Sequence, residues 1–313
     1  MIYTVTLNPT LDITYVVKDL QRDETNIASQ VLKGPGGKGI NVSRALHNLR
    51  VDSLALALIG GFTGTEVEFL LHKEGLLLWL VRIASETRTN VVIMNQKDGT
   101  QMSITAQGPR IKPVEHQTLV RILDEITQAP GHLVLSGSIP PAVHPDIYDH
   151  LIRSAKGKGL ITVLDTSGEP LRAGIMAGPH LIKPNRHELE NLVGRKLSEE
   201  KELLEAARSI VASGVQTVVV SLGEEGALMV DTERAWRGRG PVIQGKDTVG
   251  AGDSMVAGLL MGMLQAKPPD EIFRMGLACG TAAVMSPAQQ LSKPGTFKRA
   301  LPGIKVEEIK RKK

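Results

Sequence analysis

The chain has 313 residues, of which 42% are hydrophobic and 22% charged, a composition that is typical of a folded globular protein and excludes a disordered one. Its net charge of +4 is matched by the four basic residues at 310–313, so the rest of the chain is neutral and no nucleic-acid partner is expected. Cys279 is the single cysteine, which excludes an internal disulfide and a multi-cysteine metal site and favours a reducing compartment.

The longest apolar stretches, such as residues 76–81, are too short to cross a bilayer. The first residues lack the basic region and the cleavage pattern of a secretory signal. We therefore expect a cytoplasmic protein with no membrane partner.

The first predicted element is a strand at Ile2–Leu7, which should end at Pro9 because proline cannot donate to a sheet ladder. Asp12 is expected in a loop just beyond that strand. In open α/β sheets ligands bind outside the carboxyl ends of strands, so Asp12 is a candidate for holding ligand hydroxyls. A turn-stabilising role is the alternative.

A glycine-rich loop at residues 34–39 carries four glycines and the cation Lys38 into a predicted helix at 42–49. Its glycines fit the Gly-x-Gly-x-x-Gly pattern of dinucleotide-binding proteins. The acidic residue expected about twenty positions further on is missing, since Asp52 comes too early and Glu66 too late. Such a loop can approach a small polar ligand closely, and a plain flexible loop is the alternative.

Residues 12–33 show short alternating apolar patches, and 87–106 are typical of a β-hairpin with Asp98 and Gly99 at its turn. Together they predict a small β unit that interrupts a chain of alternating strands and helices. Between its two parts we expect a strand at 53–59, a helix at 65–71 and a strand at 81–84. Arg88, at the base of the hairpin, has a planar guanidinium that matches phosphate oxygens, with a surface ion pair as the alternative.

From residue 113 on, predicted helices and strands alternate. The helices are expected at 114–127, 145–155 and 199–212, and the strands at 133–135, 161–164, 181–182 and 217–220. This alternation predicts a mainly parallel sheet that helices cover on both faces. Polar clusters follow the strands at 136–141, 183–188 and 221–226, where such sheets bind their ligands.

The segment Asp247–Asp253 is a glycine turn that leads into an apolar helix, which should begin at about Gly252. The first turn of a helix has unpaired N–H groups with partial positive charge, and glycines let an anion approach them closely. Asp253 in the same turn could accept a proton from an attacking hydroxyl. The segment is therefore a candidate phosphoryl-transfer site, with an ordinary helix start as the alternative.

These segments, in this order and spacing, resemble the ribokinase-like (PfkB) carbohydrate kinase family, in particular its 1-phosphofructokinase and tagatose-6-phosphate kinase branch. The resemblance extends over essentially the whole chain. Seven motifs carry it, at Thr6–Pro9, Gly36–Val42, Thr87–Asn90, Ser136–Pro140, Lys183–Glu188, Ser221–Gly223 and Asp247–Asp253.

The resemblance implies an α/β, ribokinase-like fold with a mainly parallel central sheet flanked by helices and a small β-sheet lid. The large nucleotide-binding domain would comprise 1–11, 34–86 and 107–313. The lid, at 12–33 and 87–106, would lie over the sugar site. The implied partners are a sugar phosphate and ATP, the implied cofactor is Mg²⁺, and a homodimer is one possible assembly.

The resemblance also implies residue roles. Asp253 would be the general base, and the amides of Gly250, Ala251 and Gly252 would form the anion hole. The sugar phosphate would be bound by Asp12, Gly36, Gly37, Lys38, Asn41, Arg88, Asn90 and Ser138. The nucleotide would be bound by Lys183, Asn185, Ser221, Gly223, Gly226, Thr248 and Cys279. Asn185 and Glu188 would hold Mg²⁺.

Three positions depart from what the family pattern leads us to expect. Ile27 stands where many relatives carry a basic lid residue. The pair Leu78 and Trp79 is more apolar than expected at this place; it could be an oligomer contact, although we expect these side chains to pack in the core. Cys279 falls near the expected adenine pocket, with a buried core thiol as the alternative.

The predicted function is ATP-dependent phosphorylation of fructose 1-phosphate to fructose 1,6-bisphosphate. Tagatose-6-phosphate kinase or 6-phosphofructokinase activity is the alternative within this class. A sugar-phosphate sensor built on a kinase scaffold is the non-enzymatic alternative. An NAD-dependent oxidoreductase would depend only on the glycine pattern at 34–39.

Overall fold

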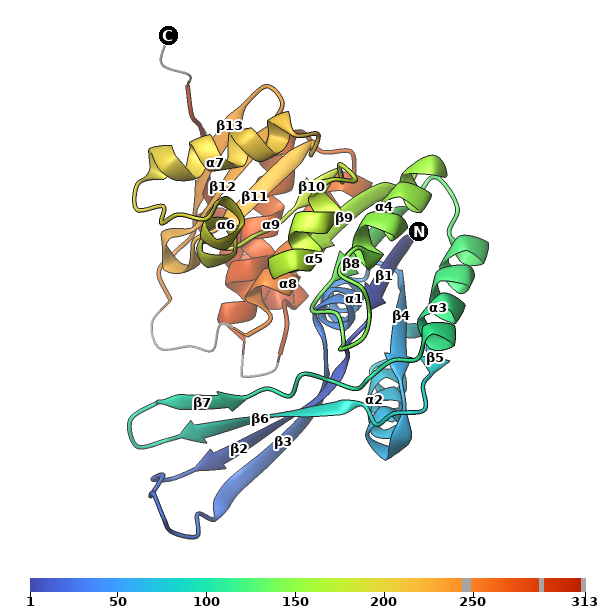
Figure 1. Ribbon diagram of the computed structural model, residues 1–313. Helices are drawn as coiled ribbons and strands as arrows, with labels where there is room; N and C mark the ends of the chain where they lie inside the picture. The colour runs from blue at the N-terminus through green and yellow to red at the C-terminus, as the bar shows by residue number, and fades with distance from the viewer. Residues whose placement is uncertain (244–248, 287–289, 311–313) are drawn as a thin grey trace.

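The computed structural model describes residues 1–243, 249–286 and 290–310, and these form two β-sheets with helices around the larger one (Figure 1). The strands of the large sheet are β1 (Ile2–Thr6), β4 (Ser53–Ile59), β5 (Leu77–Arg82), β8 (His132–Ser136), β9 (Ile161–Asp165), β10 (Leu181–Ile182), β11 (Thr217–Ser221), β12 (Ala227–Asp231), β13 (Ala235–Arg239) and β14 (Lys305–Glu308). Their spatial order is β14-β13-β12-β11-β10-β9-β8-β1-β4-β5. The pairs from β11 to β5 are parallel, and β12, β13 and β14 add antiparallel strands at one edge.

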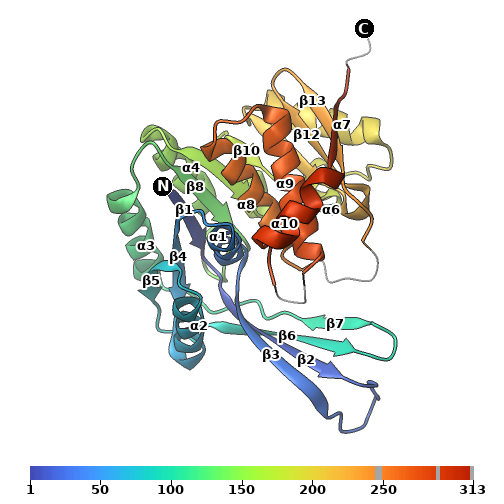
Figure 2. The ribbon, with the colours of Figure 1, turned by 180° about the vertical axis from the view of Figure 1, so that it is seen from behind.

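The helices cover both faces of this sheet. They are α1 (Lys38–Asn48), α2 (Gly61–Lys73), α3 (Pro113–Ile126), α4 (Ile147–Gly157), α5 (Gly168–Ile175), α6 (Arg186–Val193), α7 (Glu200–Ala212), α8 (Ala251–Leu264), α9 (Pro269–Val284) and α10 (Pro294–Ala300). Helices α4 to α7 lie on the face seen in Figure 1, and α1, α8, α9 and α10 lie on the face seen in Figure 2. The predicted α/β class with a mainly parallel central sheet is confirmed.

Alternate residues of each central strand enter two separate apolar cores. In β1, for example, Tyr3 and Val5 pack with helices α3 and α4, whereas Ile2 packs with α1 and α8 on the opposite face. A strand that is buried on both faces needs apolar residues at consecutive positions. This requirement explains why central strands such as β4 and β11 contain runs of consecutive apolar residues.

The second sheet consists of β2 (Thr10–Val17), β3 (Ala28–Gly36), β6 (Arg88–Asn95) and β7 (Gln101–Ile104), in the order β3-β2-β6-β7. It projects from the body of the molecule (Figure 1). Asp12 pairs with Asn90 in the register of β2 and β6 and faces the large domain, whereas the alternate position Tyr15 faces outward. The period of two along each strand thus separates an inner face that carries Asp12 and Asn90 from an outer face that carries Tyr15 and Val31.

Three local expectations were wrong. Asp12 lies within β2 and not in a loop, because Pro9 ends only β1 and a new strand begins at Thr10. The strand expected at 81–84 is β5, at Leu77–Arg82. Trp79 on this strand is 42% exposed instead of packed in the core, because β5 is the edge strand of its sheet.

Helices α8 and α9 pack closely enough to require glycine at their crossing. A Cβ added at Gly258 would lie 2.5 Å from the carbonyl oxygen of Met275 and 2.8 Å from Cys279 Sγ. This contact fixes the helix that begins at the candidate catalytic turn.

We predict that Gly258→Ala lowers the free energy of unfolding by about 1–3 kcal/mol, because the packed α9 backbone cannot yield without strain. Thermal or denaturant unfolding measures the effect. The matched control is Gly157→Ala at the end of α4, where a Cβ would have no neighbour within 4 Å, and this change should be neutral or stabilising by up to about 1 kcal/mol. Equal stability of the two variants would contradict the proposed close packing.

Candidate active site

A cavity of about 1690 Å³ lies between the small sheet and the carboxyl ends of the parallel strands. It contains residues from nearly every motif that the sequence singled out. The predicted residues that line it are Asp12, Gly37, Lys38, Asn41, Arg88, Asn90, Ser138, Lys183, Asn185, Glu188, Ser221, Gly223, Gly226, Gly250, Ala251, Gly252 and Asp253.

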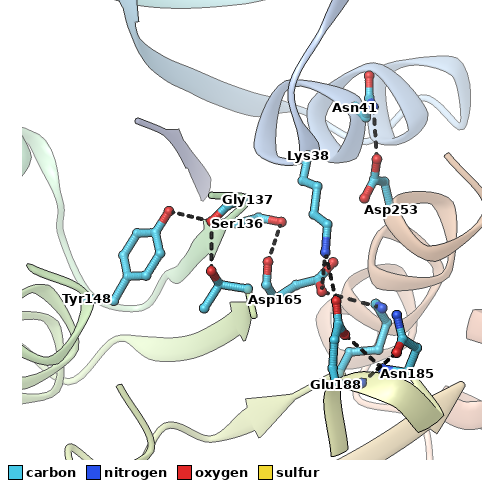
Figure 3. A network of polar contacts seen from close by, with 11 residues as sticks. Lys38, Asn41, Ser136, Gly137, Tyr148, Asp165, Asn185, Glu188 and Asp253 are labelled. Atoms are coloured by element: carbon cyan, nitrogen blue, oxygen red, sulfur yellow. Dashed lines mark hydrogen bonds and ion pairs between the residues drawn. The ribbon is translucent and has the colours of Figure 1, made fainter. Parts of the chain in front are cut away.

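The Asp253 carboxylate lies in the first turn of α8, inside this cavity. Gly250 caps the helix in the left-handed conformation with φ 78°, so the helix begins at Ala251, one residue before the predicted start. Asn41 of α1 donates a hydrogen bond from Nδ2 to Asp253 Oδ2 at 2.8 Å (Figure 3). The first N–H groups of a helix have no partner within it, and Gly250, Ala251 and Gly252 line the same cavity as the carboxylate.

Burial raises the pKa of Asp253 to about 6, and the negative charge of Asp165 adds to this effect. Lys38, the hydrogen bond from Asn41, and Lys183 act in the opposite direction. A carboxylate with a pKa near 6 is a stronger base than an exposed aspartate and is still ionised at neutral pH. This combination suits a group that accepts a proton.

The side chain of Asp165, at the end of β9, is fully buried and contacts Lys183 and also Lys38, which Figure 3 shows beside it. Its Oδ1 lies 3.2 Å from Lys38 Nζ and 3.4 Å from Lys183 Nζ. Burial opposes its ionisation, but Lys183 and Lys38 hold the pKa of Asp165 below its usual value. Asp165 in turn is the main reason why the pKa of Lys38 lies above its usual range. The cluster therefore keeps Lys38 charged within the cavity.

The loop after β8 holds the backbone of Asp165 in place through hydrogen bonds. Gly137 N donates to the Asp165 carbonyl at 2.9 Å, and the Gly137 carbonyl accepts hydrogen bonds from Tyr148 and Thr166 at 3.0 and 2.8 Å (Figure 3). Tyr148 is fully buried. These bonds fix the backbone from which the cavity residues Ser138 and Asp165 extend.

Asn185 and Glu188 form a capping box at the start of α6. Asn185 Oδ1 accepts from Glu188 N, and Asn185 N donates to Glu188 Oε2, both at 2.8 Å. The other carboxylate oxygen, Glu188 Oε1, lies 3.7 Å from Lys38 Nζ. The predicted metal motif thus also has a structural role, which orients Glu188 toward the lysine cluster.

On the small sheet, Asn90 Nδ2 donates to Asp12 Oδ1 at 3.0 Å. Burial raises the pKa of Asp12, while this hydrogen bond acts against it. Gly36, also predicted to bind substrate, does not line the cavity. It lies behind Asp12 instead, where a Cβ would come within 2.1 Å of Asp12 Oδ2, so glycine is needed for Asp12 to occupy its position.

The prediction that Cys279 lines the nucleotide pocket is wrong. Its side chain is fully buried with Met261 and Met275, against Gly258 of α8. The neighbouring α9 residues Gly280 and Thr281 line the cavity, because each residue of a helix is rotated by about 100° from the last. Thr248, the remaining predicted nucleotide contact, lies outside the described residues.

The chain matches the model of the pfkB family carbohydrate kinases over residues 5–295. It belongs to this family. It is 36% identical to 1-phosphofructokinase of Borreliella burgdorferi over 310 residues, which cover 99% of each chain. It is 31% identical to tagatose-6-phosphate kinase of Staphylococcus epidermidis, over 99% of this chain and 100% of that one. The crystal structure of phosphofructokinase-2 from Escherichia coli in complex with substrates and products has a TM-score of 0.91 at 34% identity, covering 96% of this chain and 98% of that chain.

As a carbohydrate kinase, the chain is a phosphotransferase, and family membership implies ATP as the phosphoryl donor. The predicted resemblance is therefore confirmed. Among the described residues, no helix is long and apolar enough to cross a membrane.

Asp165 and Asn8 are among the cavity residues that were not predicted as site residues. Asp165 ends β9, and Asn8 lies two residues beyond the end of β1. An acidic or amide side chain at or just beyond the end of a buried strand was the available signal, because the carboxyl edge of a parallel sheet binds ligands. Their partners could not be predicted, since Lys38 and Asp165 are 127 positions apart.

The residues present are compatible with Mg²⁺. Among the described residues, no three His, Cys, Asp or Glu side chains are grouped so that they could hold a metal. Magnesium is usually held by only one or two carboxylates together with water and substrate phosphates. Asp165 Oδ2 is buried and has no hydrogen-bond partner among the described residues. Glu188 Oε1 lies 3.7 Å from Lys38 Nζ, which also contacts Asp165.

We predict that Asp253→Asn stabilises the folded protein at neutral pH. The pKa of Asp253 rises from 3.8 to about 6 on folding, so between these values the folded state binds a proton that the unfolded chain has released. Wild-type stability therefore falls as pH rises through this window. The variant should be more stable by about 2–3 kcal/mol above pH 6, with the difference vanishing below pH 4.

Thermal unfolding of both proteins between pH 4 and pH 8 measures this difference. Asp98→Asn, in the exposed turn between β6 and β7, is the control and should bring no stabilisation at any pH. A constant difference between Asp253→Asn and wild type across the range would contradict the raised pKa.

Proposed function

We propose that this chain is an ATP- and Mg²⁺-dependent kinase that converts fructose 1-phosphate to fructose 1,6-bisphosphate. The observation that carries the proposal is the Asp253 carboxylate, buried at the start of α8 beside unpaired helix amides and the Lys38–Asp165–Lys183 cluster. The full-length similarity to proteins named 1-phosphofructokinase supports the choice of acceptor.

In the proposed reaction Asp253 accepts the proton of the free C6 hydroxyl as its oxygen attacks the γ-phosphorus of ATP. The bond to the bridging oxygen breaks and ADP leaves. The amides of Gly250, Ala251 and Gly252 donate to the oxygens of the phosphoryl group in transfer, and Lys38 and Lys183 offset its negative charge. Mg²⁺, held by Glu188 and Asn185 directly or through water, would neutralise charge on the ATP phosphates.

The acceptor would lie between the inner face of the small sheet and α1. Asp12 and Asn90 would hold sugar hydroxyls, together with Gly37 and Asn41, while Arg88 and Ser138 would bind the existing phosphate. Ser221, Gly223 and Gly226 would line the nucleotide side. The small sheet, roughly 12–33 and 87–106, would act as a lid whose closure excludes water and limits ATP hydrolysis.

Tagatose-6-phosphate kinase activity is the second candidate, supported by 31% identity to proteins of that name. Both sugar phosphates would fill the same cavity, and the stereochemistry of their hydroxyls would distinguish them. The oxidoreductase alternative loses its only basis, because the glycine pattern at 34–39 spans the end of β3 and the start of α1 in a carbohydrate kinase.

We predict that Asp253→Asn lowers kcat by about 10²–10⁴-fold with fructose 1-phosphate, because general-base catalysis contributes this much. Since the pKa of Asp253 is about 6, wild-type kcat/KM should fall tenfold per pH unit below that value. A coupled ADP-release assay with fructose 1-phosphate, tagatose 6-phosphate and fructose 6-phosphate measures both effects and ranks the acceptors by kcat/KM.

Titration calorimetry shows whether the variant still binds the sugar phosphate, as it should. Tight binding by wild type without turnover of any acceptor would instead support a sugar-phosphate sensor. A variant with undiminished kcat would exclude Asp253 as the base.

We also propose that the chain forms a homodimer through the outer face of the small sheet. Exposed apolar side chains share this face, namely Tyr15, Val31, Met102 and Ile104. Apolar faces of this kind mark contact sites, and a tetrameric form of phosphofructokinase-2 from Escherichia coli is among the similar structures.

We predict that the double change Met102→Glu and Ile104→Lys converts a dimer to a monomer in light-scattering chromatography, because charges on the face oppose its burial. Val114→Lys, at an exposed apolar position of α3, is the control and should leave the mass unchanged. A wild-type monomer at all concentrations would contradict the proposal.

A further inference from the structure

Asn8 lies where three segments of the chain meet. It follows β1 and is only 3% exposed. Its Nδ2 donates to the carbonyl of Gln107 at 2.8 Å and to Ser138 Oγ at 3.1 Å. One side chain thus connects the end of β1 with the segment that leaves the small sheet and with the loop after β8.

The direction of these hydrogen bonds follows from the groups involved. A carbonyl oxygen can only accept, so the atom of Asn8 that faces Gln107 must be the amide nitrogen. An amide nitrogen has two hydrogens, and the second goes to Ser138 Oγ. The Ser138 oxygen is therefore an acceptor toward Asn8, which leaves its own hydrogen free to be donated into the cavity that Ser138 lines.

The backbone of Asn8 also holds Arg88. Arg88 donates from Nη2 to the Asn8 carbonyl at 2.9 Å and from Nη1 to the Ala106 carbonyl at 2.7 Å. Ala106 directly precedes Gln107, so the bond from Asn8 Nδ2 to Gln107 steadies both carbonyls that orient the guanidinium. No salt bridge between described residues includes Arg88, and Asp12 acts on its charge only through a longer-range electrostatic interaction.

The chain is shaped to leave room for the Asn8 side chain. Gly108 has φ +104°, and a Cβ there would lie 2.1 Å from Asn8 Oδ1. A larger residue at 108 would displace the amide. The segment Gln107–Gly108 therefore accommodates this one side chain in this one orientation.

We propose that Asn8 is a positioning residue for the phosphate that the acceptor already carries: it turns the Ser138 hydroxyl into a hydrogen-bond donor and aligns it with Arg88. Asn8 acts through these two groups and not on the phosphate itself. The inference rests on the proposed function, since it assumes an acceptor with a phosphate at the Arg88 end of the cavity.

The experiment compares Asn8→Ala, Asn8→Asp, Ser138→Ala and the double variant Asn8→Ala/Ser138→Ala by steady-state kinetics. Asn8→Ala and Ser138→Ala should each raise KM for the sugar phosphate about tenfold, the effect of one hydrogen bond to a charged group. Because Asn8 acts in part through Ser138, the two losses should overlap, and the double variant should lose clearly less than the roughly hundredfold that independent effects would give. Asn8→Asp should lose about a hundredfold, since a carboxylate has no hydrogen to donate and repels the phosphate.

The KM for ATP should stay within about twofold of wild type in every variant. Losing even one weak hydrogen bond to ATP would change its KM by more than this. The control is Asn191→Asp, which makes the same chemical change at an exposed position of α6, where Asn191 Nδ2 lies 3.1 Å from His187 Nε2. Its kinetics should be unchanged. Circular dichroism identifies a variant that fails to fold, and Asn8→Asp, which keeps the size of the side chain, then carries the test.

Multiplicative losses in the double variant, or an equal rise in KM for ATP, would overturn the role of Asn8. If wild type turns over no acceptor, the proposed function fails separately. The affinity of the same variants for inorganic phosphate, measured by titration calorimetry, then still tests the positioning of Ser138 and Arg88. Equal phosphate affinity of wild type and Asn8→Asp would overturn the inference by this second measurement.

Discussion

The site depends on one buried carboxylate, Asp165, which lies between Lys38 and Lys183. The two lysines come from the start of α1 and the end of β10, so the ion cluster ties together segments from distant parts of the sequence. Removing one partner of a buried ion pair typically costs about 3–5 kcal/mol, because the other charge is left uncompensated. The cluster has one more positive than negative charge, which suits a cavity that must gather several phosphates.

The same burial has opposite consequences for the two neighbouring acids. Asp165 stays ionised because two lysines contact it. Burial and the negative charge of Asp165 raise the pKa of Asp253, and its direct partner, the neutral amide of Asn41, offsets only part of this rise. Two carboxylates in one cavity thus acquire different roles from their environments. One holds cations in place, and the other is suited to exchange a proton.

Because side chains alternate along a strand, one face of the small sheet lines the cavity and the opposite face is exposed. Asp12 and Asn90 face the cavity, and the alternate positions Tyr15 and Ile104 are apolar and exposed. Arg88 lies at the point where this sheet meets the large domain, and its guanidinium is held by carbonyls from both. A movement of the small sheet would therefore directly change the position of Arg88, which is proposed to bind the acceptor phosphate.

The sequence by itself determined the α/β class, most strands and helices of the large domain, and the glycine turn before Asp253. These depend on local patterns, namely apolar periodicity, proline and glycine positions, and motifs in a fixed order. Only the tertiary structure decided that Asp165 pairs with two lysines, that Asn8 reaches Ser138 over 130 positions, and that Cys279 points away from the cavity while Gly280 lines it. Which distant residues become partners, and which way a helical side chain points, depend on how the elements pack together. Local sequence patterns do not record contacts between residues that are far apart in the chain.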